Sequence, residues 1–272
     1  MSTSGVATGV DAALRAAAAV LLDEPSALIS DIDGTLSRIV ARPEDATVDP
    51  ELAAILDELA NRLSLVAVVT GRDAATARRM LPAKRIAFVT HYGVTPDHEI
   101  VTDTRLDAAR ARARQLFADL PGLTFEEKGL SLALHYRNCA DPDAVRARLL
   151  ETLTPLVATA GGRLLEGKRV VEIVPAELPD KASAVAKITA ESNLRGVVYL
   201  GDDVADVSVF HQLARRRTEQ GLPGLAIAVV DRETDPAVSE GADVALEGVT
   251  AVAAFLARLP RALGDGRKSR DG

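Results

Sequence analysis

The sequence predicts an α/β protein, in which a parallel sheet carries helices on both faces and a second domain interrupts the chain. Short runs rich in β-branched residues alternate with longer amphipathic patterns, which is typical of a parallel sheet. The chain has 272 residues, of which 47% are hydrophobic and 26% are charged, so it can bury a sizeable core. A stretch in the middle breaks the alternation and indicates an insertion.

Five short segments have the pattern of buried strands bounded by turn residues. They span residues 27–31, 64–70, 86–91, 197–201 and 225–230. The clearest helix begins with Asp49 as N-cap and Pro50 in its first turn, followed by apolar residues on one face. The apolar stretch 12–22 contains Arg15 and is shorter than the roughly 20 residues of a membrane helix. We therefore expect an amphipathic surface helix there.

The middle segment predicts a domain with its own order of a helix, two strands, a helix and two strands. Asp141 caps its second helix, Pro142 begins that helix and Gly161-Gly162 end it. The predicted organisation is a core of residues 1–102, which includes the N-terminal helix, and 180–259, with an inserted α/β domain at 103–179 and a disordered tail at 260–272.

Charge and cysteine content restrict the partners and the compartment. The formal net charge of −7 disfavours nucleic acid and anionic membranes as partners, so an anionic substrate would need local positive charge or a metal. Cys139 is the only cysteine and has no partner for an internal disulfide, which favours a reducing, cytoplasmic compartment. The sequence leaves the oligomeric state open, a monomer included.

Candidate chemistry begins directly after the first predicted strand, at Asp31-Ile32-Asp33-Gly34-Thr35. In an extended segment, residues two apart point the same way, so Asp31 and Asp33 can face one reacting centre. A hard cation such as Mg²⁺ would remove their mutual repulsion and could contact a substrate phosphate. Asp31 is then the candidate nucleophile toward phosphorus, and Asp33 the candidate general acid and base. A simple turn at Asp33-Gly34 is the alternative interpretation.

Two further predicted strands also end in reactive groups, and the carboxyl ends of parallel strands meet at one edge of the sheet. Thr70-Gly71-Arg72 places a hydroxyl and a turn where a phosphoryl oxygen could be held. Gly201-Asp202-Asp203, followed by Asp206, places acids that favour a metal. Plain helix capping is the alternative at both places.

Lys181 is predicted to lie in the first turn of a helix that Asp180 opens. A cation at the positive end of a helix is unfavourable unless an anion lies nearby. Lys181 is therefore a candidate for neutralising phosphate charge, and a solvated lysine is the alternative.

These ordered motifs, from Asp31-x-Asp33 through Thr70-Gly71-Arg72 and Lys181 to Gly201-Asp202-Asp203, resemble those of the haloacid dehalogenase superfamily of phosphohydrolases over residues 27–259. The resemblance implies a Rossmann-like core with an inserted α/β cap. It also implies that Mg²⁺ is held by the Asp31 side chain, the Asp33 backbone carbonyl and Asp202, with Asp203 and Asp206 in support.

Residues 34–40 with 42–46, 126–128 leading to 135–137, and 167–168 leading to 172–175 are similar to the trehalose-phosphate phosphatases. This resemblance implies a sugar phosphate as substrate, in particular trehalose 6-phosphate. Leu132, Leu134 and Tyr136 share one face of a predicted strand, so polar neighbours face the other way. We expect a sugar-binding set made of Glu126, Lys128, His135, Arg137 and Glu172. A solvated outer face of the sheet is the alternative.

Two departures from the family pattern widen the choice of substrate. Ala205 and Val207 stand where the family usually has Thr and Glu around the acidic motif, and His91-Tyr92 precede Gly93 where a histidine usually comes directly before glycine. Another sugar or glycoside phosphate therefore remains open. A sugar phosphomutase, which would return the phosphoryl group to its substrate, and a sugar-phosphate sensor without turnover are alternatives from other classes.

Overall fold

The computed structural model of the chain describes residues 6–93, 106–129 and 131–270. The side chains of Tyr92 and of residues 265–270 lie outside this description. The chain divides into two compact units, a core unit of residues 1–93 and 180–272 and a cap unit of residues 94–179. The predicted domain boundary between residues 102 and 103 falls outside the described residues.

A seven-stranded parallel sheet in the order β1-β11-β10-β9-β2-β3-β4 forms the centre of the core unit. Its strands are β1 (Ala7–Thr8), β2 (Ser26–Ser30), β3 (Leu65–Val69), β4 (Ala87–Val89), β9 (Gly196–Gly201), β10 (Gly224–Val230) and β11 (Val244–Glu247). All five predicted strands are confirmed. The sequence pattern had not indicated β1 and β11, which are short and extend one edge of the sheet.

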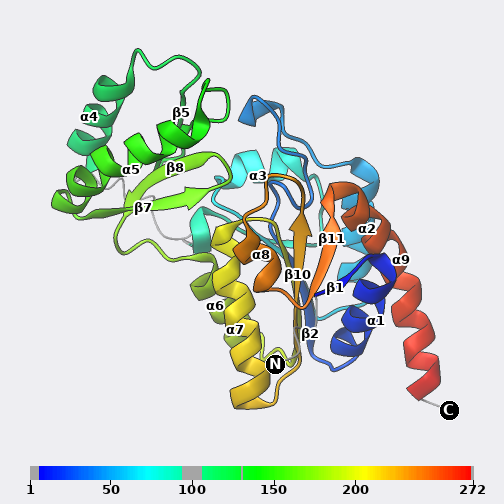
Figure 1. The fold of residues 1–272 in the computed structure, drawn as a ribbon. Coiled ribbons are helices and arrows are strands. Elements are labelled where there is room, and N and C mark those ends of the chain that lie inside the picture. The colour runs from blue at the N-terminus through cyan, green and yellow to red at the C-terminus, as the bar shows by residue number, and fades with distance from the viewer. Residues whose placement is uncertain (1–5, 94–105, 130, 271–272) are drawn as a thin grey trace. The chain divides into compact units, whose positions relative to one another are not determined.

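Helices cover both faces of this sheet, as the alternating pattern predicted (Figure 1). They are α1 (Val10–Leu21), α2 (Pro50–Ala60), α3 (Ala74–Met80), α6 (Lys181–Glu191), α7 (Val204–Gln220), α8 (Pro236–Glu240) and α9 (Gly248–Arg270), with single turns η1 (Pro43–Asp45) and η2 (His91–Gly93). Along β2, Leu28 packs with α1, α2 and α9, whereas Ala27 and Ile29 pack with α6, α7 and α8. This alternation is the period of two expected for a strand that is buried on both faces.

Sequence patterns at the helix ends predicted the start of α2 correctly and the end of α9 incorrectly. The Asp49 carboxylate accepts from the backbone N–H of Glu51 at 2.9 Å, and α2 begins at Pro50, which confirms the predicted cap. The predicted disordered tail is wrong where it begins, because α9 continues past Pro260. Leu263 is buried against the apolar core, so packing outweighs the high glycine and charge content of this segment.

The cap unit contains a four-stranded antiparallel sheet in the order β5-β6-β8-β7, with two helices. The elements are α4 (Asp107–Phe117), β5 (Thr124–Glu127), β6 (Leu132–His135), α5 (Pro142–Thr159), β7 (Gly162–Gly167) and β8 (Val170–Pro175). Their order is the predicted one. Leu132, Leu134, Val171 and Ile173 pack with α4 and α5 on one face, which leaves the polar side chains of the same strands on the other.

The order of strands in the core sheet reverses at β2. From β2 the chain builds outward through β3 and β4, and its later strand β9 lies on the opposite side of β2. The backbone N–H of Asp31 donates to the carbonyl of Leu200 at 2.9 Å, so the ends of β2 and β9 lie next to each other. Such a switch point is where ligands bind in open parallel sheets. Among the described residues, none of the helices combines the length and apolar character needed to cross a bilayer.

Candidate active site

Acidic side chains from the ends of β2 and β9 converge at the switch point. One carboxylate oxygen from each of Asp31, Asp202 and Asp206 lies within 4.8 Å of the other two, and all three residues are buried. Grouped carboxylates in a protein interior need a cation for compensation. A set of hard oxygen donors suits a divalent metal such as Mg²⁺. The residues present therefore fit the predicted metal site.

Two glycines permit this convergence. A Cβ atom on Gly34 would lie 1.9 Å from Oδ2 of Asp202, and Gly34 has a φ of +82°. A Cβ atom on Gly201 would lie 2.3 Å from the carboxyl carbon of Asp206. Only glycine fits such positions without moving its neighbours. The two glycines are therefore part of how the acids come together.

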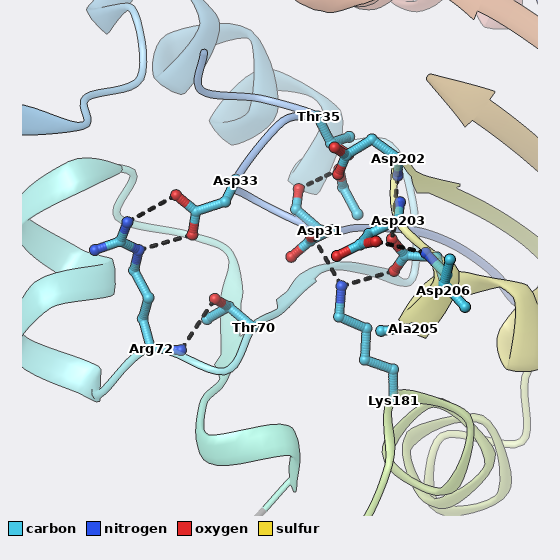
Figure 2. Close-up of polar contacts among 12 residues, drawn as sticks. Asp31, Asp33, Thr35, Thr70, Arg72, Lys181, Asp202, Asp203, Ala205 and Asp206 are labelled. Atoms are coloured by element: carbon cyan, nitrogen blue, oxygen red, sulfur yellow. Dashed lines mark hydrogen bonds and ion pairs between the residues drawn. The ribbon is translucent and has the colours of Figure 1, made fainter. Parts of the chain in front are cut away.

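Asp206 is completely buried and its carboxylate accepts four hydrogen bonds, of which the one from Lys181 can be followed in Figure 2. Its Oδ1 accepts from Nζ of Lys181 at 2.7 Å and from the hydroxyl of Tyr199 at 2.6 Å. Its Oδ2 accepts from the backbone N–H groups of Asp202 and Asp203 at 3.1 and 3.0 Å. These bonds commit the lone pairs of Asp206, so Asp31 and Asp202 are the better placed metal ligands of the three.

Lys181 lies between two carboxylates, which supply the anions expected near this helix start, while its predicted role toward phosphate stays a prediction. Its Nζ is 2.9 Å from Oδ2 of Asp31 and 2.7 Å from Oδ1 of Asp206. Asp180 caps α6, as predicted, by accepting from the backbone N–H of Ser183 at 2.8 Å. Burial disfavours the charged ammonium, but the carboxylates of Asp206 and Asp31 outweigh it and hold the pKa of Lys181 well above its ordinary value.

At Asp31, burial outweighs the attraction of the neighbouring ammonium, whereas at Lys181 the neighbouring charges outweigh burial. Burial raises the pKa of Asp31 from 3.8 to about 7, with smaller upward contributions from Asp206 and Asp33, although Lys181 acts to lower it. The Asp31 carboxylate is therefore costly to ionise without a further cation nearby. A divalent metal would supply that charge and displace the proton.

Asp33 is turned toward Arg72 (Figure 2). Nε and Nη2 of Arg72 donate to the two carboxylate oxygens of Asp33 at 2.7 and 2.8 Å, and Nη1 donates to the carbonyl of Pro43 at 3.2 Å. Each nitrogen of this buried guanidinium thus has a protein acceptor. Because a guanidinium carries five N–H donors and these bonds use three of them, the predicted substrate-binding role of Arg72 stays a prediction.

Thr70 is buried, and its hydroxyl oxygen accepts from the backbone N–H of Arg72 at 3.2 Å. This is the turn expected after β3, and it leaves the hydroxyl hydrogen available for another acceptor. Gly71 lies between them in that turn. The predicted phosphate-binding roles of Thr70 and Gly71 remain predictions.

Asp203, predicted as a metal ligand, serves as the N-cap of α7. Its side chain accepts from the backbone N–H of Val204 at 2.7 Å and forms a capping box with Asp206. Its carboxylate is not among the three that lie within 4.8 Å of one another. Asp202 belongs to that group of three, and its Oδ1 accepts from the hydroxyl of Thr35 at 3.3 Å. The geometry therefore favours Asp202 over Asp203 as a ligand.

The cap unit brings four of the five predicted sugar-binding residues together on the face of its sheet that is free of helices. Oε2 of Glu126 lies 2.8 Å from Nε2 of His135 and 3.9 Å from Nζ of Lys128. The same Nζ lies 3.5 Å from Oε2 of Glu172, whose other oxygen accepts from the hydroxyl of Ser131. We refer to Glu126, Lys128, His135 and Glu172 as the cap polar set.

Glu172 is almost fully buried, with 3% of its surface exposed. A simple solvated outer face does not account for that degree of burial. The register of the sheet places the small Ala133 between Glu126 and Glu172. Arg137, the fifth predicted sugar-binding residue, donates from Nη2 to the backbone carbonyl of Lys168 at 3.3 Å.

Tyr199 and Ser131 contact the predicted site residues, although nothing in their sequence context had indicated a role. Tyr199 lies in an apolar strand and looks like core material until its hydroxyl is seen on Asp206. Of the departures from the family pattern, Val207 packs partly buried against the apolar cluster of α6, α7 and α8. Ala205 lies beside the site without a polar side chain (Figure 2), and the side chain of Tyr92 is outside the described residues.

The parallel sheet, its switch point and the insertion define the class of the protein, an α/β fold shared with the haloacid dehalogenase-like phosphatases. The solved structure of the C-terminal domain of a trehalose-6-phosphate phosphatase from C. albicans superposes with a TM-score of 0.76 at 19% identity, covering 96% of this chain and 99% of that one. At this level of identity the likeness concerns the fold alone.

Sequence comparison identifies the family. The family model described as trehalose-phosphatase matches residues 29–242. A probable trehalose-phosphate phosphatase of Sinorhizobium fredii is 31% identical over 212 residues, covering 75% of this chain and 77% of that protein. An uncharacterized glycosyl hydrolase of Mycobacterium tuberculosis is 35% identical over 201 residues, covering 68% of this chain, but the match spans only 15% of that longer protein. The chain belongs to the trehalose-phosphatase family.

Proposed function

We propose that the protein is a Mg²⁺-dependent phosphatase that hydrolyses trehalose 6-phosphate, or a closely similar sugar phosphate, through a phosphorylated Asp31. The observation that carries the proposal is the convergence of Asp31 with Asp202 and Lys181 at the carboxyl edge of the sheet. Membership of the trehalose-phosphatase family supports the same chemistry.

In the first half of the reaction, a carboxylate oxygen of Asp31 attacks phosphorus and the bond from phosphorus to the sugar oxygen breaks. Asp33 donates its proton to that departing oxygen, once its carboxyl group has turned from Arg72 toward the substrate. In the second half, water gives a proton to Asp33 and attacks the same phosphorus. The bond to Asp31 then breaks, which releases inorganic phosphate and restores both carboxyl groups.

Charge compensation comes from groups around Asp31. Asp31, Asp202 and the backbone carbonyl of Asp33 would hold the metal, which when bound stabilises negative charge on the transferring phosphoryl group. Lys181 supplies a fixed positive charge on the other side of Asp31. The hydroxyl of Thr70 is free to donate to a phosphoryl oxygen, since its oxygen is anchored by the N–H of Arg72.

Recognition of the sugar falls to the cap unit in this proposal. The cap polar set offers two carboxylates, an ammonium and an imidazole on one face of the sheet, and sugar hydroxyls can both donate to and accept from such groups. Among the sugar phosphates we propose trehalose 6-phosphate, because several relatives of this chain are described as trehalose-phosphate phosphatases.

The test is a phosphate-release assay with Mg²⁺ across trehalose 6-phosphate, sucrose 6-phosphate, glucosylglycerol phosphate and simple hexose phosphates. We expect stoichiometric inorganic phosphate, the highest kcat/KM on trehalose 6-phosphate, and loss of turnover on chelation that added Mg²⁺ restores. If the protein formed an isomeric sugar phosphate and released no inorganic phosphate, it would be a phosphomutase. Tight binding without turnover would show a sensor.

A further inference from the structure

Tyr199 is a fully buried ionisable residue that the proposed reaction does not use. It lies in β9 near the acidic loop, and its ring packs edge-on against Phe210 with 6.1 Å between centroids. Its hydroxyl donates to Oδ1 of Asp206 at 2.6 Å. Burial, followed by the nearby Asp206, raises the pKa of Tyr199 well above its ordinary value, so the hydroxyl stays protonated and remains a donor.

The same oxygen of Asp206 also accepts from Lys181. The ammonium lies 2.7 Å from this oxygen and 2.9 Å from Oδ2 of Asp31, so it is shared almost evenly between two carboxylates. A second donor on the shared oxygen takes up part of its negative charge. The hydroxyl of Tyr199 therefore weakens the hold of Asp206 on the ammonium and favours contact with Asp31.

Packing alone does not explain a hydroxyl at this position. A phenylalanine would make the same edge-on contact with Phe210. Without the hydroxyl, Oδ1 of Asp206 would still accept from Lys181 and Oδ2 from two backbone amides. The carboxylate would therefore keep three of its four donors, and the loss would fall on Oδ1, the oxygen that Lys181 shares.

We infer that Tyr199 is a positioning residue, whose hydroxyl acts through Asp206 to keep the Lys181 ammonium beside the nucleophile Asp31. The inference rests on the proposed function, because it assigns Tyr199 to the phosphatase reaction. Tyr199 would touch neither substrate nor metal. Its contribution would lie in kcat, which depends on the charge beside Asp31, and much less in substrate affinity.

The first experiment compares Tyr199→Phe with Phe210→Leu, using p-nitrophenyl phosphate and Mg²⁺. In Tyr199→Phe we expect kcat to fall about 10-fold with KM within about twofold, because only the charge distribution at the nucleophile changes. Phe210→Leu disturbs the same ring contact without touching the hydroxyl. It should lower the melting temperature and leave kcat within about twofold of the wild type. Equal losses of kcat in the two variants would reduce Tyr199 to a packing role and overturn the inference.

The second experiment places Tyr199→Phe in an Asp206→Asn background. If the hydroxyl acts only through the Asp206 carboxylate, the added substitution should have no further effect on kcat there. An undiminished 10-fold loss in that background would overturn the inference, and so would an unchanged kcat in Tyr199→Phe alone.

These outcomes are distinct from a failure of the proposed function. A wild-type protein that releases no phosphate, or an Asp31→Asn variant that keeps full activity, would refute the phosphatase proposal itself. An active, Asp31-dependent enzyme that is indifferent to Tyr199→Phe would refute only the role of Tyr199.

Discussion

The acid cluster of the core unit and the polar set of the cap unit hold their charges in different ways. In the core, Asp31 and Lys181 are at most 6% exposed, and Asp206 is held in part by two backbone amides. In the cap, the side chains of Glu126 and His135 are about one quarter exposed, at 26% and 24%. Their contacts run from side chain to side chain between neighbouring strands.

Under the proposed function, this difference would separate the reaction from the recognition of the sugar. Groups held by backbone and burial keep one geometry, as a step common to all phosphate monoesters requires. Partly exposed side chains that pair with other side chains, such as Glu126 and His135, can exchange those contacts for sugar hydroxyls at small cost. We therefore expect substitutions in the core to affect every substrate and substitutions in the cap to affect sugar phosphates alone.

The largest effect should come from Asp31→Asn in the core. Loss of the nucleophile should lower turnover at least about 10³-fold on both trehalose 6-phosphate and p-nitrophenyl phosphate. Because the buried carboxylate is costly to ionise, the amide should leave the fold intact, which a thermal melt would show. Undiminished phosphate release by a folded Asp31→Asn protein would contradict the assignment.

An intermediate effect, confined to one substrate class, should come from Glu172→Gln in the cap. Removing the charge beside Lys128 and Ser131 should lower kcat/KM for trehalose 6-phosphate about 10- to 100-fold, the size expected for hydrogen bonds to a charged group. Turnover of p-nitrophenyl phosphate, which carries no sugar, should not change.

Glu127→Gln is the matched control for this cap variant. Glu127 lies on β5 next to Glu126 but pairs with Arg114 of α4 at 2.5 Å, away from the cap polar set. It should behave like the wild type on both substrates. A loss of p-nitrophenyl phosphate turnover in Glu172→Gln would contradict the assignment of sugar recognition to the cap and of the reaction to the core.

The remaining effect concerns stability and not turnover, and should be a pH dependence of unfolding in the metal-free core. The pKa of Asp31 is about 7 in the folded protein and near 3.9 in an unfolded chain. Between these values the folded state holds a proton that the unfolded state has lost. Wild-type stability should therefore fall as the pH rises from about 4 to 7, relative to Asp31→Asn, by at most about 1.4 kcal/mol per pH unit.

Denaturant unfolding of both proteins in the presence of a chelator measures this slope. The relative loss should level off above pH 7, where Asp31 is ionised in both states. Curves that stay parallel over the whole range would mean that Asp31 is not protonated in the folded metal-free protein.

Sequence patterns predicted most of the framework because the relevant signals are local. Five core strands, the caps at Asp49, Asp141 and Asp180, and the order of elements in the insertion all follow from periodicity and capping chemistry. The tail was predicted wrongly because its composition favours disorder, whereas Leu263 packs against a core built from distant segments.

Within the candidate site, the sequence singled out residues but not their partners. Asp203 was expected to support the metal, with helix capping as the alternative, and the structure shows it as the N-cap of α7. Arg72 was placed in the substrate-binding set, and only the structure shows that its guanidinium also pairs with Asp33 and donates to the carbonyl of Pro43. The direction of a side chain at a strand end depends on the residues that pack around it, and a short sequence motif does not identify those residues.

What the amino-acid sequence determined by itself was the class of fold and the order of the chemically active residues along it. Strand and helix periods, caps and glycines act over a few residues and can be read directly from the chain. Only the tertiary structure decided which carboxylates share a cation site and which are committed elsewhere. The physical reason is that burial and hydrogen bonding, acting between segments as distant in sequence as Asp31, Lys181 and Asp206, set the charge and orientation of each group.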